Sequence, residues 1–375
     1  MNVPKIRFPN YIDNYEKLKY GDVLKIKSGR DQKQVECENG QYPILGTGGE
    51  IGRSNSYLYN KPSVLIGRKG TINKPQYMET PFWTVDTLFY SEIFDTCFPK
   101  YLYYSFQNVN WKKYDESTGV PSLSCSTIEK VDCFIPKKDE QIKVSNFLSL
   151  LDKKIELQSK KIEDLKLFKK GLSNDLIDCI NEYNEFTLED IGTTYSGLSG
   201  KAKEDFENGN SKFISFMSVL KDKIEVDKLP TVKIDSNENQ NKVQKNDLFF
   251  NTSSETKEEV ALCSTINEDI DNLYLNSFCF GYRINNLKLV NNEYLNIMLH
   301  CTSYRKLISN LGQGFTRVNI SKKELMNLIV KVPSIDVQIK IVDIIKKVKN
   351  IINLGLEKLN KLLEFKKGLM QQLFI

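Results

Sequence analysis

Two stretches, Pro136-Lys-Lys-Asp-Glu-Gln-Ile-Lys-Val144 and Pro333-Ser-Ile-Asp-Val-Gln-Ile-Lys-Ile341, decide the fold of this 375-residue chain. They lie 197 residues apart. Further along, Phe168-Lys-Lys-Gly-Leu172 matches Phe365-Lys-Lys-Gly-Leu369 at the same separation, without a gap. Two matched blocks at one separation indicate an internal duplication, in which a variable block and a helical block each occur twice.

Each proline is followed by apolar residues at heptad spacing, which predicts two long amphipathic helices of about 35 residues. The seam positions are Leu148, Ile155, Ile162, Lys169 and Leu176 with Leu151, Gln158, Leu165 and Leu172 in the first helix, and Ile345, Ile352, Leu359, Lys366 and Leu373 with Val348, Gly355, Leu362 and Leu369 in the second. Gly171 and Gly368 are expected to loosen or end the helices. An amphipathic helix of this length must bury its apolar stripe. The simplest solution is an antiparallel pair, and the alternative is that each helix packs on its own domain.

The variable blocks, roughly residues 13–135 and 184–332, contain short β-rich runs separated by glycine and asparagine. The clearest runs are Ser63–Gly67, Thr84–Tyr90, Asp247–Phe250 and Ser277–Tyr282, and two further runs, Tyr101–Phe106 and Tyr294–Leu299, are predicted to be helical. Each block is therefore predicted to be an α+β domain.

Composition and charge exclude several classes of protein. The net charge is only +5, so DNA binding by charge alone is not expected, and either local patches on this chain or its partners would neutralise any DNA phosphates. The eight cysteines form no CxxC pair and the chain has one histidine, His300, so no zinc or other metal site is predicted. No apolar run is long enough for a membrane helix, and Met1–Asn10 does not resemble a signal peptide. We therefore expect a soluble cytoplasmic protein.

The sequence contains no recognised catalytic motif, and no catalytic residue is predicted. Gly46-Thr-Gly-Gly-Glu-Ile-Gly52 has Ile51 where a dinucleotide loop has its third glycine, so a turn is the better interpretation. The phosphate-loop, GxSxG and HExxH motifs are absent, and a single histidine removes most triad designs. Asp139-Glu140 begins a predicted helix, where acidic residues favour the dipole, and we interpret the pair as a cap or an interface.

The order of two unlike blocks and two like helices, together with Pro136…Asp139-Glu140-Gln141-Ile142, resembles the specificity subunit of type I restriction–modification systems. The resemblance extends over nearly the whole chain. In the second copy Val337 replaces Glu140, while Gln338 keeps the glutamine. The resemblance implies an α+β fold with two α/β target-recognition domains, separated by two long helices that form an antiparallel coiled coil with pseudo-two-fold symmetry.

The resemblance also implies domain boundaries and partners. Residues 1–137 and 184–332 would be the two target-recognition domains, and residues 138–183 and 333–375 the helical spacers. The subunit would read a split site in double-stranded DNA, with the helices setting the unread interval between the halves. Two methyltransferase subunits, which carry S-adenosylmethionine, would dock on it, and restriction subunits would join them. This chain would need no cofactor of its own and would not bind a membrane.

Candidate DNA-reading residues are polar side chains in glycine-punctuated segments, because Arg pairs well with guanine and Gln with adenine. They are Thr47, Arg53, Arg68, Lys69, Thr71 and Lys74 in the first block, and Ser253, Ser254, Thr256, Lys257, Gln313, Thr316 and Arg317 in the second. The predicted partner-docking residues are Glu140, Gln141, Gln338, Phe168 and Phe365.

Two other functions remain open from the sequence alone. One is a duplicated coiled-coil adaptor that binds proteins and has no role on DNA. The other is an enzyme whose site matches no known motif.

Overall fold

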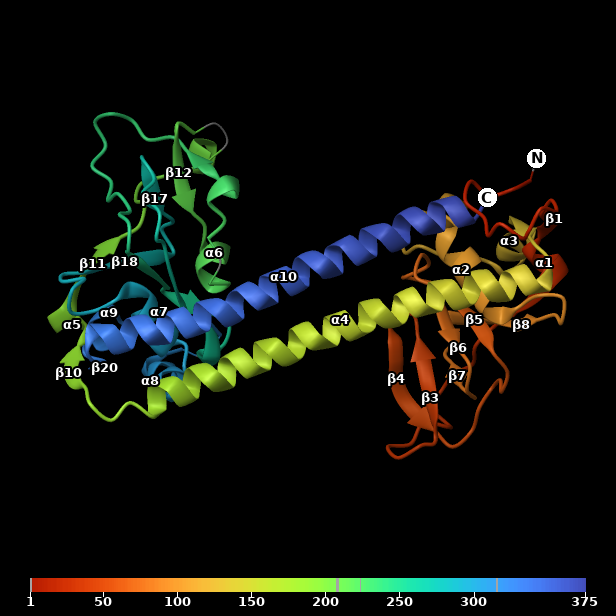
Figure 1. The fold of residues 1–375 in the computed structure, drawn as a ribbon, viewed down its shortest axis with the longest axis horizontal. Coiled ribbons are helices and arrows are strands. Elements are labelled where there is room, and N and C mark those ends of the chain that lie inside the picture. Colours follow the sequence, from red (N-terminus) through yellow and green to blue (C-terminus); the bar gives the residue numbers. More distant parts are fainter. Residues whose placement is uncertain (1, 207–208, 223, 315) are drawn as a thin grey trace. The chain divides into compact units, whose positions relative to one another are not determined.

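The computed structural model describes residues 2–206, 209–222, 224–314 and 316–375. Internal contacts divide the chain into two compact units, formed by residues 1–160 with 356–375 and by residues 161–355. Two long helices, α4 (Lys138–Asp178) and α10 (Ile335–Leu373), each contribute one part to either unit (Figure 1).

The first unit contains three sheets, with strand orders β1-β9, β2-β8-β5-β6 and β4-β3-β7. The strands are β1 (Glu16–Lys19), β2 (Leu24–Lys27), β3 (Tyr42–Gly46), β4 (Gly49–Ser54), β5 (Ser63–Gly67), β6 (Gln76–Met78), β7 (Trp83–Thr84), β8 (Leu88–Ile93) and β9 (Asp132–Ile135). The short helices are α1 (Tyr20–Val23), α2 (Pro99–Asn108), η1 (Trp111–Tyr114) and α3 (Cys125–Lys130).

The second unit contains four sheets, with strand orders β10-β20, β11-β18-β14-β16, β13-β12-β17 and β15-β19. The strands are β10 (Asn184–Thr187), β11 (Gly192–Ser196), β12 (Ser211–Ile214), β13 (Thr231–Val232), β14 (Leu248–Asn251), β15 (Ser253–Ser254), β16 (Cys263–Thr265), β17 (Leu273–Leu275), β18 (Cys279–Ile284), β19 (Val318–Asn319) and β20 (Ile329–Val332). The short helices are α5 (Leu188–Ile191), η2 (Lys203–Phe206), α6 (Phe216–Leu220), η3 (Val226–Lys228), η4 (Lys257–Glu259), α7 (Asn292–Leu299), α8 (Thr302–Leu311) and α9 (Lys322–Met326).

The two units repeat one topology, which confirms the predicted internal repeat. In each four-stranded sheet the neighbouring strands are antiparallel, and the central strand β5 of the first unit corresponds to β14 of the second. In each three-stranded sheet one pair is antiparallel and the other parallel, with β3–β7 matching β12–β17. The predicted helical runs lie in α2 and α7.

Each unit has its own apolar core, and both long helices take part in both cores. In the first unit Val144 and Leu148 of α4 join Met370 and Leu373 of α10 around buried aromatic residues. In the second unit Ile177 near the end of α4 shares a core with residues near the start of α10. The start of one helix thus meets the end of the other in each unit, and the predicted antiparallel coiled coil is confirmed.

The long helices exceed the predicted length, at 41 residues for α4 and 39 for α10. The expectation that Gly171 and Gly368 loosen or end them is wrong, because both helices continue through the glycine to Asp178 and Leu373. A glycine inside a helix costs about 1 kcal/mol relative to alanine, and flanking helical turns readily outweigh that amount.

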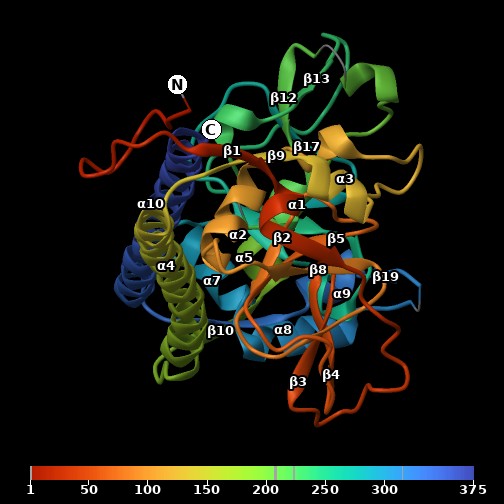
Figure 2. The same cartoon turned by 90° about the vertical axis from the view of Figure 1, so that its right-hand side faces the viewer.

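An N-terminal segment precedes β1 and has no counterpart in the second unit. The backbone N–H of Ile6 donates to Gln372 O at 3.1 Å, and the ring centroids of Phe8 and Phe147 lie 5.9 Å apart. The segment therefore contacts both long helices within the first unit, and Figure 2 shows it beside the C-terminal end of α10.

Candidate nucleic-acid interface

In the first unit, most predicted DNA-reading residues lie on the loop between β5 and β6. Arg68, Lys69, Thr71 and Lys74 are on this loop, and Lys69 and Lys74 are exposed. A backbone hydrogen bond fixes the start of this loop to the segment before β8, because the N–H of Arg68 donates to Thr87 O at 2.8 Å. A tight backbone geometry at Gly70, with φ +84°, needs the freedom of glycine.

Thr47 lies next to this loop although it belongs to another sheet. It is at the tip of the β3–β4 hairpin, where the side chain of Gln76 donates to Gly46 O at 2.8 Å. Arg53 is not brought to the same place, because it lies at the opposite end of β4. Its guanidinium donates to Gly40 O at 2.9 Å and to Gln41 O at 3.2 Å. Arg53 is therefore partly engaged in holding its own hairpin.

In the second unit, the predicted residues form two adjoining groups. Strand β15, which contains Ser253 and Ser254, pairs with β19 and so brings the segment before β19 alongside. Arg317 Nε donates to Ser253 Oγ at 3.1 Å. The predicted residues of these two segments are Ser253, Ser254, Thr256, Lys257, Gln313, Thr316 and Arg317.

Exposure separates these residues into two sets. Ser253 and Ser254 are 6% and 7% exposed, and Ser254 Oγ donates to Glu259. Thr256, Lys257, Gln313, Thr316 and Arg317 are exposed. Three carboxylates, those of Glu255, Glu258 and Glu259, surround Lys257 in the sequence, so this surface is not a simple basic patch.

The loops of the two units occupy equivalent positions in the repeated fold. The first loop follows β5 and the second follows β14, and these are the corresponding strands of the two four-stranded sheets. In the first unit Lys69 forms an isolated bridge with Ser122, just as β15 pairs with β19 in the second. The residues on the two loops have little in common, whereas the framework under them is the same.

Thr118 and Val120 lie beside the loop between β5 and β6, and they are not among the DNA-reading residues predicted from the sequence. Both are exposed, Val120 at 66%, on the segment that precedes Ser122. The available signal was the alignment of Gly119 with Gly314, because Gly314 directly precedes the group that includes Arg317.

The three acidic or amide residues predicted for docking are buried. Glu140, at 1% exposure, accepts from Arg7 Nε and Nη2 at 2.7 Å each and from Tyr15 OH at 3.0 Å. The hydrogen bond to Glu140 raises the pKa of Arg7. Burial first, and the Glu140 charge second, raise the pKa of Tyr15. Glu140 therefore anchors the N-terminal segment, and its carboxylate is buried within the first unit.

Gln141 joins the start of α4 to the domain before it. Its Oε1 accepts from the N–H of Phe98 at 2.7 Å, and its Nε2 donates to Pro136 O at 2.9 Å. Because the side chain is 1% exposed, these bonds replace those that water would otherwise make.

Gln338 makes the same joint at the start of α10. Its Oε1 accepts from the N–H of Asn291 at 2.8 Å, and its Nε2 donates to Pro333 O at 2.8 Å and to Leu289 O at 2.9 Å. The conserved spacing of proline and glutamine in the two copies thus has a structural cause, which is to fix the long helix on its domain.

Phe168 and Phe365 differ from the other predicted docking residues, because they are 58% and 56% exposed. Further exposed apolar residues lie on the same helices, Leu157 and Leu167 on α4 and Leu354 on α10. Exposed apolar side chains therefore occur along both long helices, among exposed charged residues.

The described residues contain no group of three or more His, Cys, Asp or Glu side chains that could hold a metal ion. Burial raises the pKa of Cys97 to about 11 and of Cys133 to about 12, so both remain thiols at neutral pH. Burial also lowers the pKa of His300, whose Nδ1 lies 2.8 Å from Asn296 O. Within the described part of the chain, no helix has the length and apolar character needed to cross a membrane.

Comparisons with known proteins agree with this architecture. A family model described as the type I restriction modification DNA specificity domain matches residues 12–167 and 180–364. The type I restriction–modification S subunit from M. genitalium is similar in fold, with a TM-score of 0.61 at 16% identity over 100% of this chain and 99% of that one. A chain from a structural study of complex assembly and conformational transition in the type I R-M system has a TM-score of 0.62 at 12% identity, over 97% and 98% of the two chains.

Two copies of one α+β domain, with unlike polar loops on a shared framework and an antiparallel helical pair, define a duplicated recognition protein. The chain belongs to the type I restriction modification DNA specificity family, and it is a DNA sequence specificity subunit.

Proposed function

We propose that each unit reads one half of a split site in double-stranded DNA and that the chain itself catalyses no reaction. The observation that carries the proposal is that unlike polar residues occupy equivalent loops of the two units. A duplicated fold whose two equivalent loops present different side chains suits the reading of two different base sequences, because contacts with base edges determine sequence preference.

The loops suggest how each half is read. Arg68 and Arg317 are candidates for bidentate contacts with guanine, and Gln313 is a candidate for a contact with adenine. In the second unit the carboxylates beside Lys257 disfavour phosphate but can accept from the amino group of cytosine. Reading by base edges therefore fits the second unit better than general attraction to the DNA backbone.

We infer that two methyltransferase subunits dock on the long helices and that restriction subunits join through them. The methyltransferase subunits would bring S-adenosylmethionine. Phe168 and Phe365, which occupy matching positions in the two copies, would take part in these contacts, together with exposed leucines of the same helices. The near-neutral charge of this chain supports an assembly in which partners neutralise DNA phosphates.

Selection of binding sites from a random DNA library tests the reading of two halves. The chain is assembled with its methyltransferase subunits, and the preferred sites of the wild type, Arg68→Ala and Arg317→Ala are compared. Each substitution is expected to relax one half-site only, by about 1–3 kcal/mol for the favoured base. Lys306→Ala, an exposed change on α8, is the matched control.

The outcomes are distinct. Relaxation of different halves by the two variants supports the proposal. Uniform weakening on every sequence would identify the two arginines as phosphate contacts, and an unchanged preference at both halves would place the reading surface elsewhere.

A further inference from the structure

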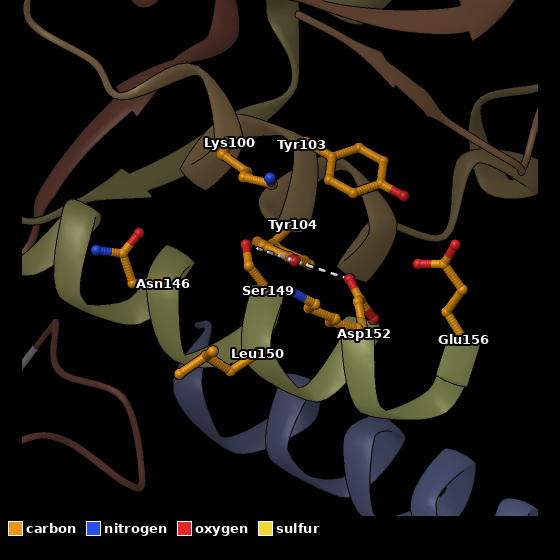
Figure 3. A pocket seen from close by; sticks show the side chains of 9 residues that line it. Lys100, Tyr103, Tyr104, Asn146, Ser149, Leu150, Asp152 and Glu156 are labelled. Carbon is orange, nitrogen blue, oxygen red and sulfur yellow. Dashed lines mark hydrogen bonds between the residues drawn. The ribbon is translucent and has the colours of Figure 1, made fainter. Parts of the chain in front are cut away.

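Lys366 of α10 is a seam lysine whose charge is neutralised inside the first unit. Its Nζ lies 2.6 Å from Asp152 Oδ1, 5.5 Å from the ring centroid of Tyr104 and 3.4 Å from Gln107 Oε1. Asp152 is held in place by the hydroxyl of Tyr104, which donates to its Oδ2 at 2.7 Å. Figure 3 shows this hydrogen bond, with Ser149 beside it.

Lys169 of α4 occupies the matching seam position of the second unit, where each of these partners is replaced. The long helices correspond at a separation of 197 residues, and α2 corresponds to α7 at a separation of 193, because Tyr101-Leu102 matches Tyr294-Leu295. The counterparts of Asp152, Tyr104 and Gln107 are therefore Lys349, Ile297 and His300. An anion, an aromatic ring and an amide have become a cation, an aliphatic chain and an imidazole.

The Lys169 ammonium consequently has no counter-ion comparable to that of Lys366. Among the described residues, no hydrogen bond or ion pair involves its Nζ. Burial first, and the charge of Lys349 second, lower the pKa of Lys169. Asp222 is the nearby carboxylate, but it already accepts from Lys349 at 3.4 Å and from Asn296 Nδ2 at 3.1 Å.

A cavity of about 260 Å³ adjoins this lysine. It is far larger than the roughly 10–15 Å³ that one water molecule requires. Its lining includes three lysines, Lys169, Lys170 and Lys349, and one carboxylate, that of Asp222. The lining also contains the amide of Asn296, so the cavity combines excess positive charge with a polar donor.

We propose that this cavity binds a small oxyanion of the phosphate type, which neutralises Lys169 as Asp152 neutralises Lys366. A phosphate offers several acceptor oxygens and one to two negative charges near neutral pH, which suits a cavity lined by three lysines better than a chloride does. The counter-ion of Lys169 in the second unit would thus be an ion bound from solution, whereas the counter-ion of Lys366 in the first unit is the side chain of Asp152.

The single histidine of the chain provides a direct probe, because His300 lines the same cavity. The charged groups that act on it are Asp222, which raises its pKa, and Arg305 and Lys169, which lower it. An oxyanion bound among these groups favours the imidazolium, so binding raises the His300 pKa.

Titration of the ¹³C-labelled His300 ring by NMR, on the full chain, tests the proposal with inorganic phosphate against chloride at equal ionic strength. Phosphate is expected to raise the His300 pKa saturably, by about one unit. Lys169→Met is expected to weaken phosphate binding at least tenfold and to fold well, because it places an apolar side chain in the helical seam. Lys161→Met, an exposed change on the same helix, is the matched control and is expected to bind normally.

A second variant rebuilds the internal counter-ion of the first unit. Lys349→Asp places a carboxylate at the position that corresponds to Asp152, so phosphate is expected to lose its effect on His300. A parallel titration with ATP in place of phosphate shows which source of the oxyanion the cavity prefers. The ligand that shifts the His300 pKa at the lower concentration is the preferred one. The proposal is overturned if phosphate produces no saturable shift, or if Lys169→Met responds as the wild type does.

Discussion

The two places where a long helix leaves its domain are alike in one residue and unlike in the residue next to it. Gln141 and Gln338 make matching hydrogen bonds to the proline five residues earlier and to the segment before α2 or α7. Their neighbours are Glu140, which is buried and paired, and Val337, which is 37% exposed. The glutamine that fixes the helix is therefore the same in both copies, whereas the residue before it differs.

The difference follows from the N-terminal segment. Arg7 and Tyr15, which bind Glu140, belong to or adjoin a stretch that precedes β1, and the second unit has no such stretch before β10. A carboxylate at the position of Val337 would find no equivalent of Arg7. An apolar residue at the position of Val337 therefore costs little stability, whereas in the first unit Glu140 is needed to pair with the Arg7 guanidinium.

The largest effect is expected from Arg7→Met, which leaves the Glu140 carboxylate buried without its guanidinium. Removal of one partner from a buried ion pair costs about 3–5 kcal/mol, and the Tyr15 hydroxyl should keep the loss near the lower end. Urea unfolding of the full chain, followed by fluorescence and circular dichroism, measures the change.

The double variant Arg7→Met with Glu140→Leu is the control for that measurement. It removes the orphaned charge and should recover most of the lost stability. A double variant that is as unstable as Arg7→Met would show that packing of the segment, and not the ion pair, determines the effect.

A smaller and equal effect is expected from Gln141→Leu and Gln338→Leu. Each substitution leaves a partly buried N–H and a buried proline carbonyl without a partner, at about 1–3 kcal/mol. The exposed Gln371→Leu on α10 should be close to neutral. Unequal losses in the two glutamine variants would contradict the interpretation that both joints have the same construction.

The duplication, the helical pair and the α+β class could be predicted because each leaves a periodic or repeated trace in the sequence. The burial of Glu140 could not, since Arg7 lies 133 residues away and no local pattern joins them. The same limit explains Gln141, whose motif suggested a docking surface although its partners are backbone groups. A motif shows that a residue type is required, and only the fold shows what the side chain contacts.

The DNA-reading candidates illustrate the same limit on a smaller scale. Gly70 and Gly314, which lie in exposed segments beside candidate residues, adopt positive φ values of +84° and +114° that favour glycine. Arg53 was grouped with Arg68 by composition, yet the β3–β4 hairpin places it at the other end of its strand. Which turns lie side by side depends on strand pairing between distant segments, and that pairing was not legible in the sequence.

The smallest effect concerns His300, whose counterpart in the first unit is Gln107. Burial holds the pKa of His300 below 6.5 in the folded chain, so the unfolded chain binds a proton first as the pH falls. Folding stability should therefore decline below about pH 6.5, with a contribution from this group of at most about 1.4 kcal/mol per pH unit. His300→Gln, which copies Gln107, should remove that part of the pH dependence and leave the rest.

Urea unfolding midpoints of the wild type and the variant, at pH 7.5 and 5.5 in phosphate-free buffer, measure this pH dependence. If the two proteins showed the same pH dependence, His300 would be protonated equally in the folded and unfolded states.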